Sequence, residues 1–131
     1  GSVTIQNCYS SGDIEGAEAG GICGTNCGYQ EGIVTIQNCY SSGNIIGTEA
    51  GGICGSNCGK ENGNVTIQSC YSSGDIEGGG ICGRFCGNHS NKTVTIENCH
   101  STGDMKGMYS GLPLFNNFCV HRRVIFWLQF G

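Results

Sequence analysis

The chain has little of what nucleic-acid-binding and membrane proteins need. Only 12% of its 131 residues are charged, and six Lys and Arg with a net charge of −4 provide no basic patch to neutralise phosphates. No apolar run reaches the roughly 18 residues of a membrane-spanning helix, and the start shows no signal-peptide pattern. We therefore expect neither nucleic-acid binding nor membrane association.

Helix-forming patterns are also missing. No segment combines apolar residues at a period of 3.6 with freedom from glycine, and there is one proline and one tryptophan. By contrast, 25 glycines and 11 cysteines are present. So much glycine raises the entropic cost of folding, so backbone pairing, stacked side chains or covalent links must offset it.

One phrase recurs four times along the chain. VTIQNCYSSGDIEG begins at Val3 and returns with few changes from Val34, Val65 and Val94, at separations of 31, 31 and 29 residues. A period of this length is typical of repeat architectures. The opening GSV occupies the place of the later GIV and GNV, so we expect this chain to be a processed product or a piece of a longer protein.

Each copy contains one clear strand pattern. Val3 and Ile5 alternate with Thr4 and Gln6, as in a half-buried strand. Strands that recur once per repeat predict an all-β parallel solenoid of about four coils, with equivalent strands about 4.8 Å apart. Every residue would then lie over its own copy. The predicted apolar columns are Ile5, Ile36, Ile67 and Ile96; Ile14, Ile45, Ile76 and Met105; and Ile22, Ile53 and Ile81.

The predicted solenoid spans residues 1–107, with coils starting near residues 3, 34, 65 and 94. Asn7, Asn38 and Asn98 recur where each coil should bend, and we expect them to form a ladder of side-chain amides that Ser69 interrupts. The third copy lacks three residues before Ile81, which a solenoid accommodates in a loop.

The repeat resembles a known family. NCYSSGDIEG followed by GGICG is similar to the GLUG-type repeat of bacterial and viral surface proteins, and VTIQNC resembles the coils of right-handed parallel β-helix proteins. The resemblance implies a right-handed parallel β-helix and an extracellular, cell-surface or virion-surface location. It covers about residues 1–107. Cysteine within GGICG departs from the pattern, so the resemblance implies nothing about cysteine chemistry.

The cysteines divide into columns. Cys8, Cys39, Cys70 and Cys99 form one, which we interpret as stacked buried thiols. Three C-x₃-C pairs form two more, and these are candidate disulfides or, less favoured, ligands of a structural metal. Disulfides between adjacent coils remain an alternative. We predict no other cofactor. The residues of the C-x₃-C pairs are Cys23, Cys27, Cys54, Cys58, Cys82 and Cys86.

Two further columns carry polar chemistry. Asp13, Asp75 and Asp104 recur with Asn44 among them, and turn chemistry explains an Asp after Ser-Gly better than catalysis does. The second column is aromatic; it either packs inward or faces outward as a surface that contacts sugars or proteins. We predict that the chain is not an enzyme, because a ladder is not a singular site. The aromatic column comprises Tyr9, Tyr40, Tyr71 and His100.

The remaining features lie outside the regular repeats. Asn88 and Asn91 begin N-glycosylation sequons, NHS and NKT, in an enlarged connector. Residues 108–131 contain the only proline and four of the five phenylalanines, and we predict that they cap the coil end, with a membrane-surface anchor as the rival.

These patterns favour a structural or adhesive surface module. Its partners would be further copies of itself, stacked head to tail into a filament, or a cell-surface glycan or protein. The alternative is a carbohydrate-binding or carbohydrate-active β-helix domain, which would need a non-repeating carboxylate cluster in a cleft.

Overall fold

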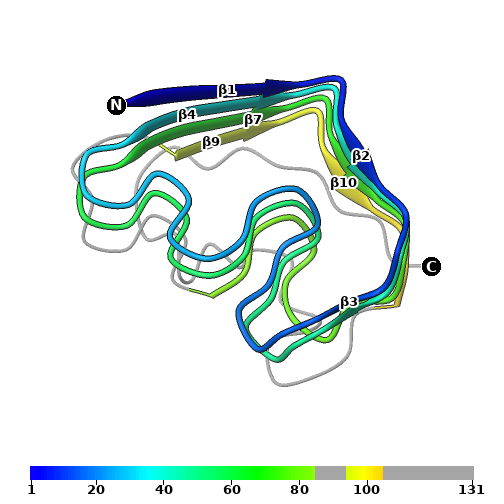
Figure 1. Ribbon diagram of the computed structural model, residues 1–131. Helices are drawn as coiled ribbons and strands as arrows, with labels where there is room; N and C mark the ends of the chain where they lie inside the picture. Colours follow the sequence, from blue (N-terminus) through cyan, green and yellow to red (C-terminus); the bar gives the residue numbers. More distant parts are fainter. Residues whose placement is uncertain (85–93, 105–131) are drawn as a thin grey trace.

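The computed structural model describes residues 1–84 and 94–104. These residues form strands, bridges and turns, with no helix among them. In particular, they include no helix of the length and apolar character needed to cross a membrane. All strand pairs are parallel, and the chain winds through successive stacked coils, an arrangement that fits a parallel β-solenoid (Figure 1).

The first sheet is built from the VTI segments. It contains β1 (Ser2–Gln6), β4 (Ile33–Gln37), β7 (Asn64–Gln68) and β9 (Val94–Glu97), paired in that order. Pairing is in register, because Ile5 lies opposite Ile36, Ile36 opposite Ile67, and Ile67 opposite Ile96. The predicted column of isoleucines is therefore confirmed.

Two smaller sheets follow after bends in each coil (Figure 1). The second sheet has the order β10-β8-β5-β2, and the third pairs β3 with β6. Isolated parallel bridges continue the stacking, including Ile45 with Ile76 and Cys23 with Cys54. The strands are β2 (Tyr9–Ser10), β5 (Tyr40–Ser41), β8 (Tyr71–Ser72), β10 (His100–Ser101), β3 (Ile14–Glu15) and β6 (Ile45–Ile46).

The bend between the first two sheets depends on a left-handed residue. Asn7, Asn38 and Asn98 have φ of 57°, 55° and 54°, and Ser69 adopts 55° at the same place. Asparagine tolerates this conformation better than most residues do. The expected ladder of asparagine amides was wrong, because no hydrogen bond joins these side chains in the part of the chain that the structure describes.

The amide ladder forms one residue earlier. Gln6 Nε2 donates to Gln37 Oε1 at 2.7 Å, and Gln37 Nε2 donates to Gln68 Oε1 at 2.9 Å. Gln68 Nε2 continues the ladder to Glu97 Oε2 at 3.4 Å. The left-handed backbone thus makes the turn, while the extended residue before it carries the side-chain ladder.

The interior is a set of narrow columns. Ile36, Ile67, Ile53 and Ile81 are fully or almost fully buried, and they pack with buried cysteines. After the bend, buried residues alternate with more exposed ones, so that Ser41 lies between the partly buried Tyr40 and the exposed Ser42, and Ile45 is buried between two exposed residues. Apolar burial is therefore distributed along the coil axis rather than gathered at a centre.

The deletion in the third copy leaves the stacking intact. Ile22 N donates to Ile53 O and Ile53 N donates to Ile81 O, both at 2.9 Å. The predicted column of these three isoleucines is confirmed. The predictions for Met105, the glycosylation sequons at Asn88 and Asn91, and the cap at 108–131 fall outside the described residues.

Close backbone stacking explains one column of glycines. A Cβ added to Gly43 would lie 2.1 Å from the carbonyl oxygen of Gly12, and a Cβ on Gly74 would lie 2.0 Å from Gly43 O. Gly12, in the first coil, would meet nothing within 4 Å. Inner coils therefore require glycine at this position for lack of space.

We predict that Ile36→Ala lowers the free energy of unfolding by about 3 kcal/mol, because a buried isoleucine loses its contacts and leaves a cavity. Ile33→Ala in the same strand serves as the matched control, since Ile33 is 48% exposed, and its loss should be below about 1 kcal/mol. Chemical denaturation followed by circular dichroism measures both. Equal losses would contradict the assigned inner face of β4.

Candidate functional site

The first cysteine column is buried from the second coil onward. Cys39, Cys70 and Cys99 are each at most 1% exposed, whereas Cys8 in the first coil is exposed. Each thiol donates a hydrogen bond to the carbonyl oxygen two residues earlier, as Cys39 Sγ does to Gln37 O at 3.2 Å. The column therefore satisfies a backbone acceptor beside the bend, in agreement with the interpretation of stacked buried thiols.

A second group of thiols gathers where the C-x₃-C segments stack. A parallel bridge pairs Cys23 with Cys54 of the next coil, and Cys27 lies in the turn that follows Cys23 in the same coil. The Sγ atoms of these three residues lie within 4.8 Å of one another. Cys54 is fully buried, while Cys23 and Cys27 are partly exposed. We call Cys23, Cys27 and Cys54 the thiol cluster.

The thiol cluster is joined by hydrogen bonds between sulfurs. The Cys27 and Cys54 thiols donate to Cys23 and lower its pKa to about 4. The pKa of Cys27 is raised, chiefly because its proton is shared with Cys23. Cys58 also interacts with Cys27 and Cys54, and Cys82 interacts with Cys54. Five sulfurs from three coils thus form one connected network.

The structure shows thiols at the candidate disulfide positions that it describes. Cys23, Cys27, Cys54, Cys58 and Cys82 all carry thiols, so the loops expected within the first two C-x₃-C pairs are not closed here. Cys86 falls outside the described residues. Proximity would still allow oxidation, and the disulfides stay a prediction for an oxidising environment.

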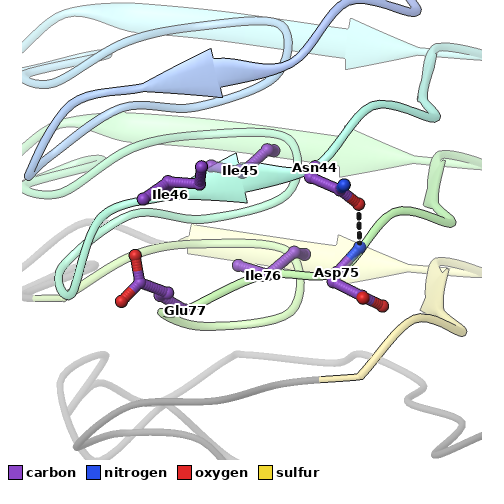
Figure 2. Close-up of a pocket in the computed structure, with 6 residues that line it drawn as sticks. All are labelled: Asn44, Ile45, Ile46, Asp75, Ile76 and Glu77. Carbon is purple, nitrogen blue, oxygen red and sulfur yellow. Dashed lines mark hydrogen bonds between the residues drawn. The ribbon is translucent and has the colours of Figure 1, made fainter.

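The acidic column is occupied by backbone contacts (Figure 2). Asp13 Oδ1 accepts a hydrogen bond from Asn44 N at 2.9 Å, and Asn44 Oδ1 accepts one from Asp75 N at 3.0 Å. Asp75 Oδ1 in turn accepts from Asp104 N at 3.0 Å. Each side chain therefore satisfies the amide of the next coil, which explains why Asn replaces Asp without loss. This arrangement supports the turn-chemistry interpretation.

A shallow depression lies beside this column. Its volume is about 370 Å³, and its lining runs from Asn44 to Ile46 and from Asp75 to Glu77 (Figure 2). Ile46 is 45% exposed and stands where Glu15 and Glu77 stand in the neighbouring coils. Two carboxylates line the depression beside its isoleucines, Asp75 and Glu77, and Asp75 Oδ1 is already held by Asp104 N.

The aromatic column faces outward. Tyr9 is 65% exposed, and its ring stacks on Tyr40 with centroids 5.2 Å apart. Tyr40 stacks on Tyr71 at 4.9 Å, and Tyr71 on His100 at 5.3 Å. Because each ring face covers its neighbour, ring edges and phenol hydroxyls are left for partners. The column cannot offer a row of open faces for sugar rings.

Two features of these sites escaped the sequence interpretation. One is the contact from the Asx side chains to the backbone amide of the next coil, for which the recurrence of only Asp or Asn after Ser-Gly was the available signal. The other is the glutamine ladder, which the identical Gln6, Gln37 and Gln68 could have indicated. Both are contacts between equivalent residues of adjacent repeats. Predicting them requires knowing which residues of two coils lie opposite each other.

Comparison with known proteins finds no relative of this chain. No protein-family model, curated protein or solved structure matches this chain. The resemblance to GLUG-type repeats therefore stays a hypothesis that rests on the quoted residues.

We predict that alkylating reagents distinguish the members of the first cysteine column. In the native protein Cys8 should react readily, whereas Cys39 and Cys70 should react only when the coils open. Iodoacetamide labelling followed by peptide mass spectrometry measures the rates, and labelling in denaturant is the control. Similar native rates at Cys8 and Cys39 would contradict the stacking.

Asn44 provides a test of the acidic column. Asn44→Ala should lower the free energy of unfolding by about 1 kcal/mol, because the Asp75 amide loses its acceptor. Asn44→Asp should preserve stability, since Asp13 and Asp75 already make the same contact. Denaturant unfolding compares the two variants. If Asn44→Asp were destabilised and Asn44→Ala were unaffected, the side-chain contact to the next coil would not be what stabilises this column.

Proposed function

We propose that this chain is a right-handed parallel β-solenoid that acts as a structural or adhesive module of a cell or virion surface. The in-register pairing of β1, β4, β7 and β9 is the observation that carries the proposal. Such pairing gives a stiff rod whose outward side chains repeat at a fixed spacing. Repeated weak contacts along a rod increase avidity. The surface location is inferred from the resemblance to GLUG-type repeats.

Head-to-tail assembly is the most specific form of this proposal. Among the described strands, β1 and β9 are the two ends of the first sheet, so each has one edge without a partner strand. Their sequences, SVTIQ and VTIE, are near copies of strands that already pair in this molecule. A second copy would place the Glu97 carboxylate beside the Gln6 amide, the same two groups that meet at Gln68 and Glu97 but with the coil order reversed. Unpaired parallel edges with matching patterns favour polymerisation.

The repeated surfaces support a binding role rather than catalysis. In the acidic column Asp13 and Asp75 each use a carboxylate oxygen to hold the adjacent coil. Of the two carboxylates that line the depression, Asp75 makes this contact and Glu77 makes none with the other residues drawn in Figure 2. We infer that the chain is not an enzyme and that its partners are other copies or a cell-surface glycan or protein. The tyrosine column would contact such a partner through its ring edges and hydroxyl groups.

We predict that Gly12→Ala blocks assembly without harming the folded chain. Gly12 has open space for a Cβ, but in a head-to-tail stack that Cβ would meet the carbonyl oxygen of Gly103 from a second copy, just as Gly43 meets Gly12 O. Wild-type protein should form concentration-dependent rods, and Gly12→Ala should remain monomeric. Sedimentation velocity and electron microscopy measure the difference.

Two variants complete this test. Ser11→Ala changes an exposed neighbour of Gly12 and should assemble as the wild type does. Gly43→Ala should instead destabilise the monomer, because its Cβ would clash with the coil above. A wild type that stays monomeric at every concentration, or a Gly12→Ala variant that assembles normally, would refute head-to-tail stacking.

A further inference from the structure

The thiol cluster has the composition of a soft-metal site. Its three Sγ atoms lie within 4.8 Å of one another, although Cys23 and Cys27 come from one coil and Cys54 from the next. Metal–sulfur bonds of about 2.3 Å in tetrahedral geometry place two sulfurs about 3.8 Å apart. Small rotations of the cysteine side chains are therefore enough to bring three sulfurs onto one ion.

A fourth ligand is available from the same pair of coils. Cys58 is fully buried in the same core cluster as Cys54, and Cys27 packs against that cluster, although the Cys58 sulfur lies outside the group of three within 4.8 Å. Two C-x₃-C pairs stacked on adjacent coils thus supply four sulfurs, the number that a tetrahedral structural zinc site uses. The donors are all thiols, and thiolates select Zn²⁺ and Cu⁺ over the hard ions Mg²⁺ and Ca²⁺.

The site is also accessible to an ion from solution. A depression of about 270 Å³ has Cys23 and Cys27 in its lining, together with Val3, Gly24, Thr25, Gly28 and Val34. Cys54 lies beneath them and is fully buried. Two partly exposed ligands over a buried one provide an access route and leave the remaining ligands shielded from water.

We propose that Cys23, Cys27, Cys54 and Cys58 bind one thiophilic d¹⁰ metal ion, Zn²⁺ or Cu⁺, and so join the first coil to the second. Any proton still on a sulfur is released to solvent as that sulfur bonds to the metal, and no electron is transferred. With Zn²⁺ all four sulfurs bind, whereas Cu⁺ needs only the three of the thiol cluster. The ion would act as a structural link between coils at the edge of the apolar core, against which Cys23 and Cys27 pack.

The competing fate of these sulfurs is oxidation. A disulfide between Cys23 and Cys27 would consume two ligands and prevent metal binding. The two outcomes differ in mass, because a disulfide removes two hydrogens and a bound ion adds its own mass. Mass spectrometry of the intact chain, purified with neither reductant nor chelator, therefore separates them directly.

The decisive experiment is a metal titration of the whole chain, reduced and kept anaerobic. Zn²⁺ and Cu⁺ are added in separate arms against a chromophoric chelator, and native mass spectrometry counts the bound ions. We expect a first equivalent that binds with high affinity in one arm and raises the thermal midpoint, since an ion that binds the folded chain alone stabilises it. Cys27→Ala should weaken that binding roughly tenfold or more. Loss of a residue that only supports a ligand already costs about tenfold in metal affinity, and Cys27 is itself a ligand.

Matched variants keep the result interpretable. Cys39→Ala removes a thiol from the other column that is more deeply buried than Cys27, and it should leave the first equivalent unchanged. Cys27→Ser preserves size if Cys27→Ala fails to fold, and circular dichroism checks each variant. The proposal is overturned if the reduced wild type binds neither ion, if Cys39→Ala and Cys27→Ala weaken binding equally, or if the purified chain contains a Cys23–Cys27 disulfide.

Discussion

Parallel, in-register backbone pairing between residues one coil apart is the constraint on which the rest of this structure depends. It places Ile5 over Ile36 and Ile36 over Ile67, so that apolar burial occurs between copies of one residue. A chain with 25 glycines and few large apolar residues has no other way to bury enough surface. The same pairing satisfies the backbone groups along each coil, which glycine-rich turns would otherwise leave exposed to competition from water.

Stacking identical residues in adjacent coils restricts which polar residues fit, because identical charges at the strand spacing of about 4.8 Å repel each other. The column that begins at Asp13 meets this condition by turning each carboxylate or amide oxygen toward the backbone amide of the next coil. The glutamine column uses an amide that both donates and accepts, and it ends on Glu97, an acceptor. Glycine at Gly43 meets the corresponding steric condition. Polar columns in this molecule therefore hold the coils together, which explains why repetition of Asp does not create an acidic site.

The cysteines respond to stacking in two ways. After the bend, Cys39 points inward and donates to a nearby carbonyl, so its column behaves as a set of small hydrophobic residues. Cys23 lies in a bridge to Cys54 and Cys27 in the turn that follows, and there the sulfurs of one coil meet those of the next. Beside the bend, each thiol thus has its own carbonyl acceptor, whereas the segment from residue 23 to residue 27 gathers sulfurs of two coils into a cluster with ligand chemistry. Only the second group has the geometry for a function beyond packing.

By itself the sequence determined the repeat length, the all-β class, the isoleucine columns and the division of cysteines into sets, because each follows from periodicity and alternation. It left the direction of Tyr40 open and placed the amide ladder on Asn38 instead of Gln37. Only the tertiary structure decided these points, since a single left-handed residue at the bend resets which side chains face inward. The meeting of Cys23, Cys27 and Cys54 likewise depends on how far the turn between the strands folds back, which is set by three-dimensional packing and not by spacing along the chain.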